Sequence, residues 1–530
     1  MPYSVPNFSG ATGTRLRTRD SYSTLSGMCT VCVDDCPGLC EIGRSAFRAQ
    51  EAIYPQPFGE VTSGAEKAFP VDLSHFQIVG RATGAWGVEP DPDVAVFTNV
   101  RLEQTLGNDD GVKLLMPFVI PGLGSTKIAA KHFDGLAAAA AITGTIVTVG
   151  ENVCAMDDEA ELSKDNPPQV LHSPALRHRV KSFLMWQDVS GGGQIVVQEN
   201  LEDRRLGVLR YAIEELGVQA VELKWGQGAK SIGGEVKIDV LAKAQRLKRR
   251  GYIVLPDPDD PAVIDAYDRG ALREFERHSR IGFVDLEAFC SRVEELRRYG
   301  AKWVFLKTGA YAAPDLARAL KYAAAAKVDV VTVDAAGGGT GMSPWRMMNE
   351  WGVPPVELLT LTRRFAQILH EKGEHVPDIV FAGGIAFEDQ VFKVLALGAP
   401  YVKAIGWARA PICAAHVAEL IVNGTKNGES NQLHAQYGTR PDQIFVLYHD
   451  LKRLLGPRVE ELPPGAIGVY HFYRRVAQGL QQLMCGARKF ALEYISADDV
   501  FALTREASDI TGVPHVMDYG MDEAMRILEE

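Results

Sequence analysis

The chain has 530 residues, of which 46% are hydrophobic and 23% are charged, which is the composition of a large globular protein with two or three domains. A net charge of −11 and a pI of about 5.7 argue against a nucleic acid as the main partner. The polar N-terminus and the lack of long apolar segments argue against a signal peptide and a membrane span, so we expect a cytoplasmic protein.

Residues 1–110 are expected to form an irregular N-terminal region that carries a cluster of cysteines. Four of the eight cysteines of the chain belong to it, namely Cys29, Cys32, Cys36 and Cys40. Disulfides are disfavoured in a reducing cytosol, so this spacing predicts metal ligation. We favour a 4Fe-4S cluster, because the spacing lacks the paired knuckles of a zinc ribbon. A structural zinc and redox-active or merely structural thiols stay as alternatives.

Residues 111–424 alternate short apolar runs with amphipathic stretches, which is the pattern of βα units around a parallel sheet. The predicted strands are residues 114–120, 144–149, 193–197, 220–224, 303–307, 328–333, 379–382 and 401–405. The helix-length stretches are residues 129–142, 201–216, 284–299, 313–326, 356–371 and 387–397. Eight strands with intervening helices predict an α/β fold of the (β/α)8 TIM-barrel class, with a doubly wound open sheet as the alternative. Residues 425–530 are expected to form a helical C-terminal extension, most clearly over 441–454 and 470–492.

Glycines follow the last three predicted strands. The first group is Gly338, Gly339, Thr340 and Gly341 in the run GGGTG, the second is Gly383 and Gly384, and the third is Gly406. Uncovered peptide N–H groups at strand ends suit a phosphate, and (β/α)8 barrels place phosphates on the loops after strands 7 and 8. A tight βα turn without a ligand is the alternative for the GGGTG run.

Lysines end two predicted strands that are otherwise largely apolar. Lys224 and Lys307 hold these positions, Gln227 and Lys230 follow in a glycine-rich loop, and Glu151 follows strand 144–149. Lysines beside a flavin can stabilise negative charge on the reduced ring or clamp a substrate carboxylate. We therefore expect a catalytic group here, against the alternative that Lys224 snorkels outward.

Motifs of several other enzyme classes are missing from the sequence. The histidines show no i, i+4 pairing with carboxylates of the zincin kind, so we expect no histidine metal site. The sequence has no G-x-S-x-G elbow and no G-x-x-x-x-G-K-[ST] loop. Hydrolase and nucleotide triphosphatase functions therefore have no support.

Three ordered motifs resemble the FMN-binding synthase domain of glutamate synthase. They are GQGAK at residues 226–230, GGGTGMSP at 337–344 and AGGIAFEDQVFKVLALGAPYV at 382–402. PFVIPGLGS at 117–125 and GEN at 150–152 are similar to the opening strands of that domain. The likeness spans roughly residues 114–420 and implies a (β/α)8 barrel that holds FMN and reduces the imine formed from 2-oxoglutarate and ammonia.

The resemblance also implies roles for individual residues. Its catalytic positions match Lys224, Gln227, Lys230 and Glu151, which would lie beside the flavin and the substrate carboxylates. The positions around FMN match Lys307, Gly338, Gly339, Thr340, Gly341, Gly383, Gly384 and Gly406. Of these, Lys307 would face the flavin ring and the others would surround the phosphate.

The sequence departs from the family in several places. We expect no glutamine amidotransferase domain, since residue 2 is Pro and the cysteines begin at position 29. The three-iron cluster motif expected after the barrel is missing, because only Cys413 and Cys485 follow residue 405. The N-terminal cysteines are expected to supply the electron relay instead. Ala386 replaces the arginine usual after GGI and KPGxGG is shortened, so the substrate need not be 2-oxoglutarate.

The sequence thus predicts an oxidoreductase in which a ferredoxin or another donor reduces a 4Fe-4S cluster and then FMN. The electrons would reduce a 2-imino acid, or the enzyme would oxidise an amine in the reverse direction, with an amino acid or a 2-oxo acid as the small-molecule substrate. An electron-transfer subunit without its own small-molecule chemistry is the alternative. A barrel with lactate-oxidase-type chemistry and a structural zinc is disfavoured, because no histidine closely follows a predicted strand. Formation of a homo-oligomer stays open.

Overall fold

A computed structural model describes residues 46, 50, 69–107, 110–226, 230, 236–339, 343–426 and 436–530. The predicted site residues Gln227, Thr340 and Gly341 lie outside these ranges. The four clustered cysteines lie outside them as well, so the predicted N-terminal metal cluster stays a prediction.

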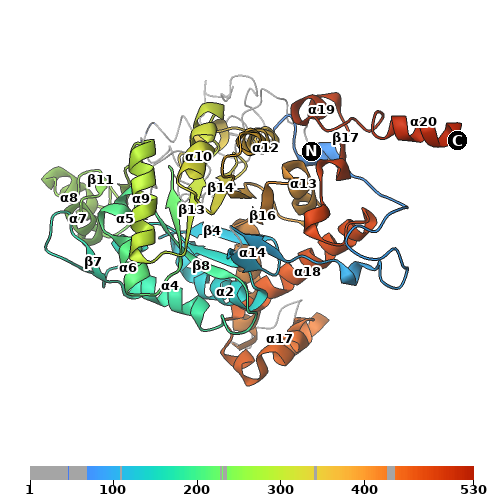
Figure 1. Ribbon diagram of the computed structural model, residues 1–530. Helices are drawn as coiled ribbons and strands as arrows, with labels where there is room; N and C mark the ends of the chain where they lie inside the picture. Colours follow the sequence, from blue (N-terminus) through green and yellow to red (C-terminus); the bar gives the residue numbers. More distant parts are fainter. Residues whose placement is uncertain are drawn as a thin grey trace, which may run out of the picture.

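Eight parallel strands close into a barrel, which confirms the predicted fold and excludes the open sheet (Figure 1). In chain order they are β4 (Phe118–Leu123), β5 (Ile146–Val149), β8 (Gln194–Glu199), β9 (Ala220–Lys224), β13 (Trp303–Thr308), β14 (Val330–Asp334), β15 (Asp378–Ala382) and β16 (Val402–Gly406). Each corresponds to one predicted strand. The first prediction, 114–120, wrongly joined β4 to the end of β3 (Val112–Leu114), a strand outside the barrel.

The interior of the barrel changes from apolar to polar along the strands. One apolar side chain from each strand packs against the hairpin of β2 (Gln104–Leu106) and β3, and these are Val119, Ile146, Val196, Ala220, Phe305, Val330, Val380 and Ala404. Two residues later on four of the strands the inner face carries Gln198, Glu222, Lys307 and Thr332. Because side chains alternate across a strand, residues two apart share a face. The hairpin therefore closes an apolar floor, and the polar layer faces the carboxyl ends of the strands.

Helices cover the outside of the barrel. They include α2 (Lys127–Thr143), α6 (Val208–Glu214), α9 (Leu286–Tyr299), α10 (Ala313–Ala325), α12 (Pro355–Glu371), α13 (Glu388–Gly398) and α14 (Arg409–Lys426). The predicted helix 201–216 is wrong in extent, because it divides into α5 (Leu201–Arg205) and α6. Gly207 lies between them at φ 68°, a left-handed conformation that ends one helix and leaves room for the next.

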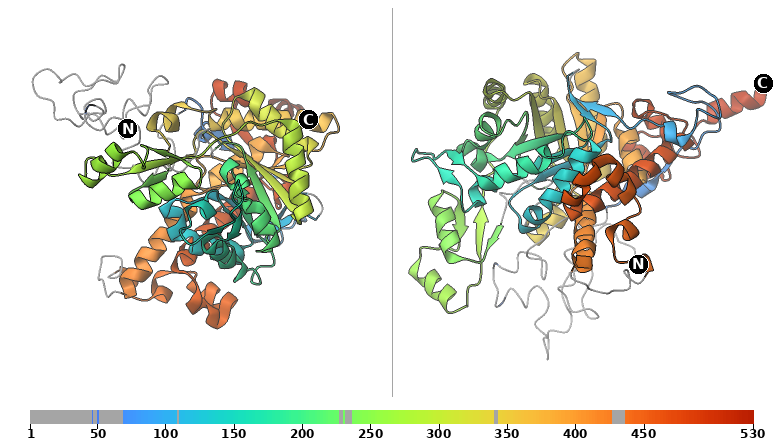
Figure 2. Two further views of the ribbon diagram at one scale, coloured as in Figure 1. Left: turned by 90° about the vertical axis from the view of Figure 1, so that its left-hand side faces the viewer. Right: turned by 90° about the horizontal axis from the view of Figure 1, so that it is seen from below.

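A small sheet projects beside the barrel between β9 and β13 and was not predicted. It consists of β10 (Val236–Ile238), β11 (Ile253–Leu255) and β12 (Phe275–His278), all antiparallel, with α7 (Leu241–Arg249) and α8 (Pro261–Asp268). Both views of Figure 2 show this insert extending away from the barrel. Its strands have only three or four residues each. This is too short for an alternation of apolar and polar residues to be recognised in the sequence.

The C-terminal segment is largely helical and packs on the barrel helices. Its main element is α18 (Pro464–Gly486), which contacts both α2 and α14. The predicted helix 441–454 is instead two helices, α16 (Pro441–Ile444) and α17 (Tyr448–Leu455). The predicted helix 470–492 lies within α18 only as far as Gly486. In the ranges that the structure describes, no helix is long and apolar enough to cross a bilayer.

Segments near the two ends of the described chain meet in a separate two-stranded sheet. Strand β1 (Phe76–Ile78) pairs antiparallel with β17 (Val500–Ala502), beside α13 (Figure 1). Beyond it, α19 (Arg505–Thr511) packs against α12, and α20 (Met521–Glu529) projects from the body. The residues before the barrel are thus fastened to the residues after it.

Candidate active site

A hydrogen-bonded polar layer lies inside the barrel above its apolar floor. Gln198 on β8 donates from Nε2 to Oε1 of Glu222 on β9, and Oγ1 of Thr332 on β14 lies 3.4 Å from Oε2 of Glu222. All three residues are at most 3% exposed. Oε1 of Gln198 is buried and has no hydrogen-bond partner among the described residues. Burial raises the pKa of Glu222, which the neighbouring charge of Lys307 only partly offsets.

Two lysine–carboxylate pairs lie at the carboxyl ends of the strands. Nζ of Lys224 lies 2.8 Å from Oε2 of Glu151, which follows β5. Nζ of Lys307 lies 3.1 Å from Oδ2 of Asp334, which ends β14. The side chains of the two lysines are 3% and 5% exposed, so Lys224 does not snorkel outward. The barrel therefore gathers two buried cations and their counter-ions at one end.

The surroundings shift the pKa of each charged group in a different direction. Burial lowers the pKa of Lys224, and the nearby charge of Lys307 lowers it further, against the attraction of Glu151. The pKa of Lys307 is raised, because Asp334 and Glu222 together outweigh the effect of burial. Burial tends to raise the pKa of Glu151, but the charge of Lys224 outweighs it and holds that pKa below its usual value. Of the two lysines, Lys224 has its pKa lowered and Lys307 has its pKa raised, so Lys224 releases its proton more readily.

Lys230 lies apart from these two pairs and contacts backbone instead. Its Nζ donates to the carbonyl oxygens of Ala336 at 2.7 Å and Trp351 at 3.0 Å, and the residue is 1% exposed. Burial lowers its pKa to about 8. Lys230 thereby ties its own loop to the start of the glycine run that follows β14. Its expected contact with the substrate stays a prediction.

The glycine loops after β14 and β15 touch each other through their backbones. A Cβ on Gly337 would lie 2.8 Å from the carbonyl oxygen of Gly383, and a Cβ on Gly383 would lie 2.8 Å from the nitrogen of Ala335. Gly383 and Gly384 adopt φ values of 113° and 93°, a region open mainly to glycine. Only glycine at positions 337 and 383 lets the two loops approach this closely.

The individual glycines differ in what surrounds them. Above Gly384 a Cβ would meet only the Cα of Gly337, at 3.9 Å, so this part of the loop borders open space. The N–H of Gly338 donates to the carbonyl of Ala335 and is used within the turn. Gly406 ends β16, where a Cβ would lie 2.8 Å from Cβ of Ala382. Of Gly383, Gly384 and Gly406, Gly384 thus has the most room for a ligand among the described residues.

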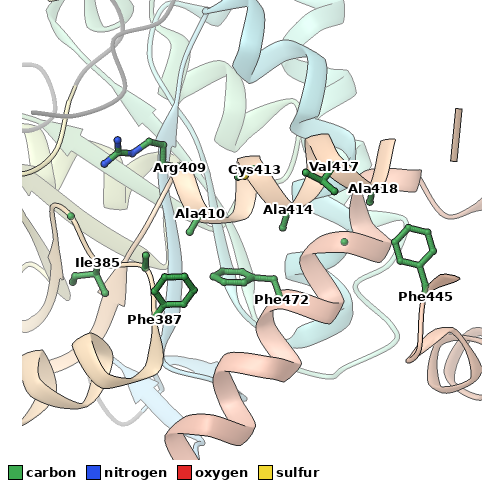
Figure 3. A pocket seen from close by; sticks show the side chains of 13 residues that line it. Ile385, Phe387, Arg409, Ala410, Cys413, Ala414, Val417, Ala418, Phe445 and Phe472 are labelled. Carbon is green, nitrogen blue, oxygen red and sulfur yellow. The ribbon is translucent and has the colours of Figure 1, made fainter. Parts of the chain in front are cut away.

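A mainly apolar cavity of about 590 Å³ adjoins Gly384 on the outside of the barrel (Figure 3). Helix α14 forms one wall with Ala410, Cys413 and Val417, and Phe387 and Phe472 line the opposite side. Arg409, at the start of α14, points away from the aromatic rings. The cavity lies behind the glycine loop rather than inside the barrel.

Sequence reasoning missed three residues of the polar layer, namely Gln198, Glu222 and Asp334. A signal for them exists, since each is a polar residue on the inward alternation of a strand whose other residues are mostly apolar. The lysines were noticed because they end their predicted strands, whereas Gln198 and Glu222 lie on the inner face of otherwise mostly apolar strands and Asp334 lies just past its predicted strand.

Comparison with known proteins relates the chain to glutamate synthases. Residues 277–417 match a family model described as a conserved region in glutamate synthase. The archaeal-type glutamate synthase [NADPH] of Thermotoga maritima is 27% identical over 392 residues, which cover 71% of this chain and 65% of that protein. The archaeal glutamate synthase [NADPH] of Methanocaldococcus jannaschii is 29% identical over 253 residues, 45% of each chain. The chain thus spans 65% or less of the length of these relatives.

Two solved structures of low sequence identity align with most of this chain. A putative lactate oxidase of Pediococcus acidilactici gives a TM-score of 0.45 at 13% identity, covering 87% of this chain and 94% of the other. The flavin-binding domain of baker's yeast flavocytochrome b2 gives a TM-score of 0.45 at 14% identity, covering 88% and 87%. The barrel assignment rests on the strand order of this chain itself. The resemblance seen in the motifs is confirmed by the family model and by the curated relatives: this chain is related to the glutamate synthases and carries their conserved region.

Proposed function

We propose that this protein is an FMN-dependent oxidoreductase of the glutamate synthase type, which reduces a 2-imino acid to an amino acid or runs the reverse oxidation. The observation that carries the proposal is the pair of buried lysines, Lys224 and Lys307, each held by a carboxylate at the end of the barrel where the glycine loops lie. The relationship to glutamate synthases supports the same class of reaction.

The residues present fit FMN. The open space above Gly384, where the backbone carries no side chain, would admit a phosphate, and Gly383 and Gly406 flank it on the loops after β15 and β16. Oε1 of Gln198, which has no hydrogen-bond partner among the described residues, and the cation of Lys307 face the interior of the barrel and could bind polar groups of the flavin. Bound in this place, FMN would supply or accept the hydride of the reaction.

The side chains of the barrel would bind the substrate and move its proton. Reduction of a C=N bond adds a hydride to carbon and a proton to nitrogen. Nζ of Lys224 is a fitting proton source, since burial lowers its pKa and Glu151 holds it in place at 2.8 Å. Lys307 keeps its charge because Asp334 and Glu222 raise its pKa, so it is suited to hold a carboxylate of the substrate or negative charge on the flavin.

Electrons would reach the flavin through a 4Fe-4S cluster on Cys29, Cys32, Cys36 and Cys40, with a ferredoxin or another cytoplasmic donor as the partner. This part of the proposal rests on the spacing of the cysteines and on the absence of the usual cluster motif after the barrel. The substrate would be a small amino acid or 2-oxo acid, together with ammonia or an amine.

Anaerobic purification followed by analysis of FMN, iron and acid-labile sulfide tests the cofactors. Dithionite-reduced protein would then be mixed with a panel of 2-oxo acids, with and without ammonia, while flavin reoxidation is recorded. We expect one FMN and four irons per chain and reoxidation only when a 2-oxo acid and ammonia or an amine are both present. Protein without FMN would contradict the proposal. Bound flavin that no substrate of the panel reoxidises, and no amino acid reduces, would favour the electron-transfer subunit instead.

A further inference from the structure

Two histidines and a glutamate from distant parts of the chain meet between helices outside the barrel. His132 lies on α2, while His416 and Glu419 lie one turn apart on α14. One donor atom from each of the three residues lies within 4.8 Å of the others, and the two imidazole rings are 5.3 Å apart between centroids. The proposed reaction makes no use of this cluster. It also departs from the expectation that the histidines form no metal site.

His132 is buried, His416 and Glu419 are half-buried, and two ring nitrogens of the cluster are unsatisfied among the described residues. His132 is fully buried, and its Nδ1 lies 2.9 Å from the carboxylate of Glu419. Nε2 of His132 and Nδ1 of His416 are buried and have no hydrogen-bond partner in the part of the chain that the structure describes. Burying a polar nitrogen without a partner is unfavourable, and a metal ion would satisfy such lone pairs.

We propose that His132, His416 and Glu419 bind one divalent transition-metal ion of the zinc type. Two imidazoles and one carboxylate form a donor set that Zn²⁺ favours, with water able to complete a tetrahedral shell. The site shares no residue with the proposed cysteine cluster or with the proposed flavin site, so the proposal goes beyond the proposed function.

The position of the cluster indicates a structural role. Helix α2 follows β4, the first barrel strand, and α14 follows β16, the last. These two strands pair at only two positions, whereas every other neighbouring pair in the barrel shares three or more. A metal ion held by both helices would therefore fasten the barrel where its strands are joined by the fewest residue pairs.

Metal content of the full-length protein tests this proposal. The protein would be stripped with a chelator, reloaded with Zn²⁺ or Co²⁺, desalted and analysed by mass spectrometry of the elements. The variants are His416→Gln and Glu419→Gln, which keep the size of each side chain. The matched control is His178→Gln, which breaks an exposed His–carboxylate pair with Asp134 on the neighbouring helix. The wild type and the three variants all keep the cysteines, so any metal ion bound by the cysteines contributes equally to the metal content of each protein.

We expect the wild type and His178→Gln to bind one metal ion per chain more than either cluster variant. The Co²⁺ form should show visible d–d bands of a nitrogen and oxygen site, and these bands should be absent from the cluster variants. Added Zn²⁺ should raise the Tm of the wild type and the control but not of the cluster variants. If His416→Gln does not fold, the same comparison with Glu419→Gln decides. Equal metal content and equal Tm shifts in all proteins would show a plain His–Glu hydrogen bond and overturn the proposal.

Discussion

Lys224 and Lys307 are register partners on the adjacent strands β9 and β13, and each is neutralised by a carboxylate from a different strand end. Two like charges side by side in a buried site repel each other, so their counter-ions, Glu151 and Asp334, decide whether the site can exist. The same arrangement gives the two lysines different proton affinities, since the pKa of Lys224 is lowered and that of Lys307 is raised.

Replacing Lys224 by Met should remove the proposed proton donor and leave the barrel intact. We expect kcat to fall by about 10²–10³, the usual loss when one charge-stabilising donor is removed from an active site. FMN content should stay unchanged, because Gly384 and its neighbours are untouched. The checks are the steady-state rate with the best substrate and the flavin-to-protein ratio.

The control for Lys224→Met is Lys237→Met in the insert. Lys237 forms a similar, largely buried ion pair with Glu276, at 2.9 Å, away from the barrel mouth. Its loss should leave kcat within about twofold of the wild type. Because Lys224→Met leaves Glu151 without its counter-ion, the double variant with Glu151→Gln separates lost chemistry from lost stability. A double variant of wild-type activity would exclude the proposed role.

Replacing Gly384 by Ala should weaken FMN binding. A left-handed residue with a Cβ costs about 1–2 kcal/mol, and this Cβ would occupy the space proposed for the phosphate. We expect the Kd for FMN to rise at least about tenfold, which corresponds to 1.4 kcal/mol. Fluorescence titration of the flavin-free protein would measure it.

Gly373→Ala serves as the control for strain alone. Gly373 has a φ of 69° and no atom within 4 Å of a built Cβ, so the substitution carries a similar backbone cost without a ligand nearby. It should lower the Tm slightly and leave FMN affinity unchanged. Equal FMN affinity in the two variants would show that the phosphate lies elsewhere.

Asp203 should make stability depend on pH between about 4 and 8. Burial raises its pKa to about 8 although the N–H groups of Asn152 and Asn200 bond to it. Between its ordinary pKa of 3.8 and about 8, the folded chain holds a proton that the unfolded chain has lost. The stabilisation is thus complete below pH 3.8 and disappears as the pH rises through 8.

Urea unfolding at pH 5.5 and pH 8 compares the wild type with Asp203→Asn. We expect the free energy of unfolding of the wild type to fall by about 1–3 kcal/mol more than that of the variant over this range. Asp165→Asn, at an exposed position, should follow the wild type. Parallel curves for the wild type and Asp203→Asn would mean that Asp203 stays ionised in the folded protein.

Cys36→Ser should interrupt the proposed electron path without disturbing the flavin site. Iron and sulfide content should fall, and reduction of FMN by a ferredoxin-type donor should be lost. Reoxidation of chemically reduced FMN by substrate should persist, because that step needs only the barrel. Cys413→Ser is the matched control, since Cys413 is exposed on α14 and outside the cluster. Full iron content in Cys36→Ser would contradict the assignment.

The barrel was predictable because each of its strands is a short apolar run of its own. The polar layer was harder to see, since Glu222 and Gln198 lie within such runs and their inward direction depends on strand register. The cluster of His132, His416 and Glu419 could not be predicted from the sequence. Glu419 is 287 positions from His132, and only the closure of the barrel brings α14 beside α2. Periodicity reports on local structure, whereas these contacts follow from how the first and last strands meet.

The apolar floor formed by the β2–β3 hairpin has a kinetic consequence. With that end of the barrel filled, the substrates and the product of the proposed reaction would share the entrance at the carboxyl ends of the strands, as far as the described residues show. The product must therefore leave before the next substrate enters. Product inhibition should be competitive with respect to the 2-oxo acid, and a mixed pattern would point to a second route.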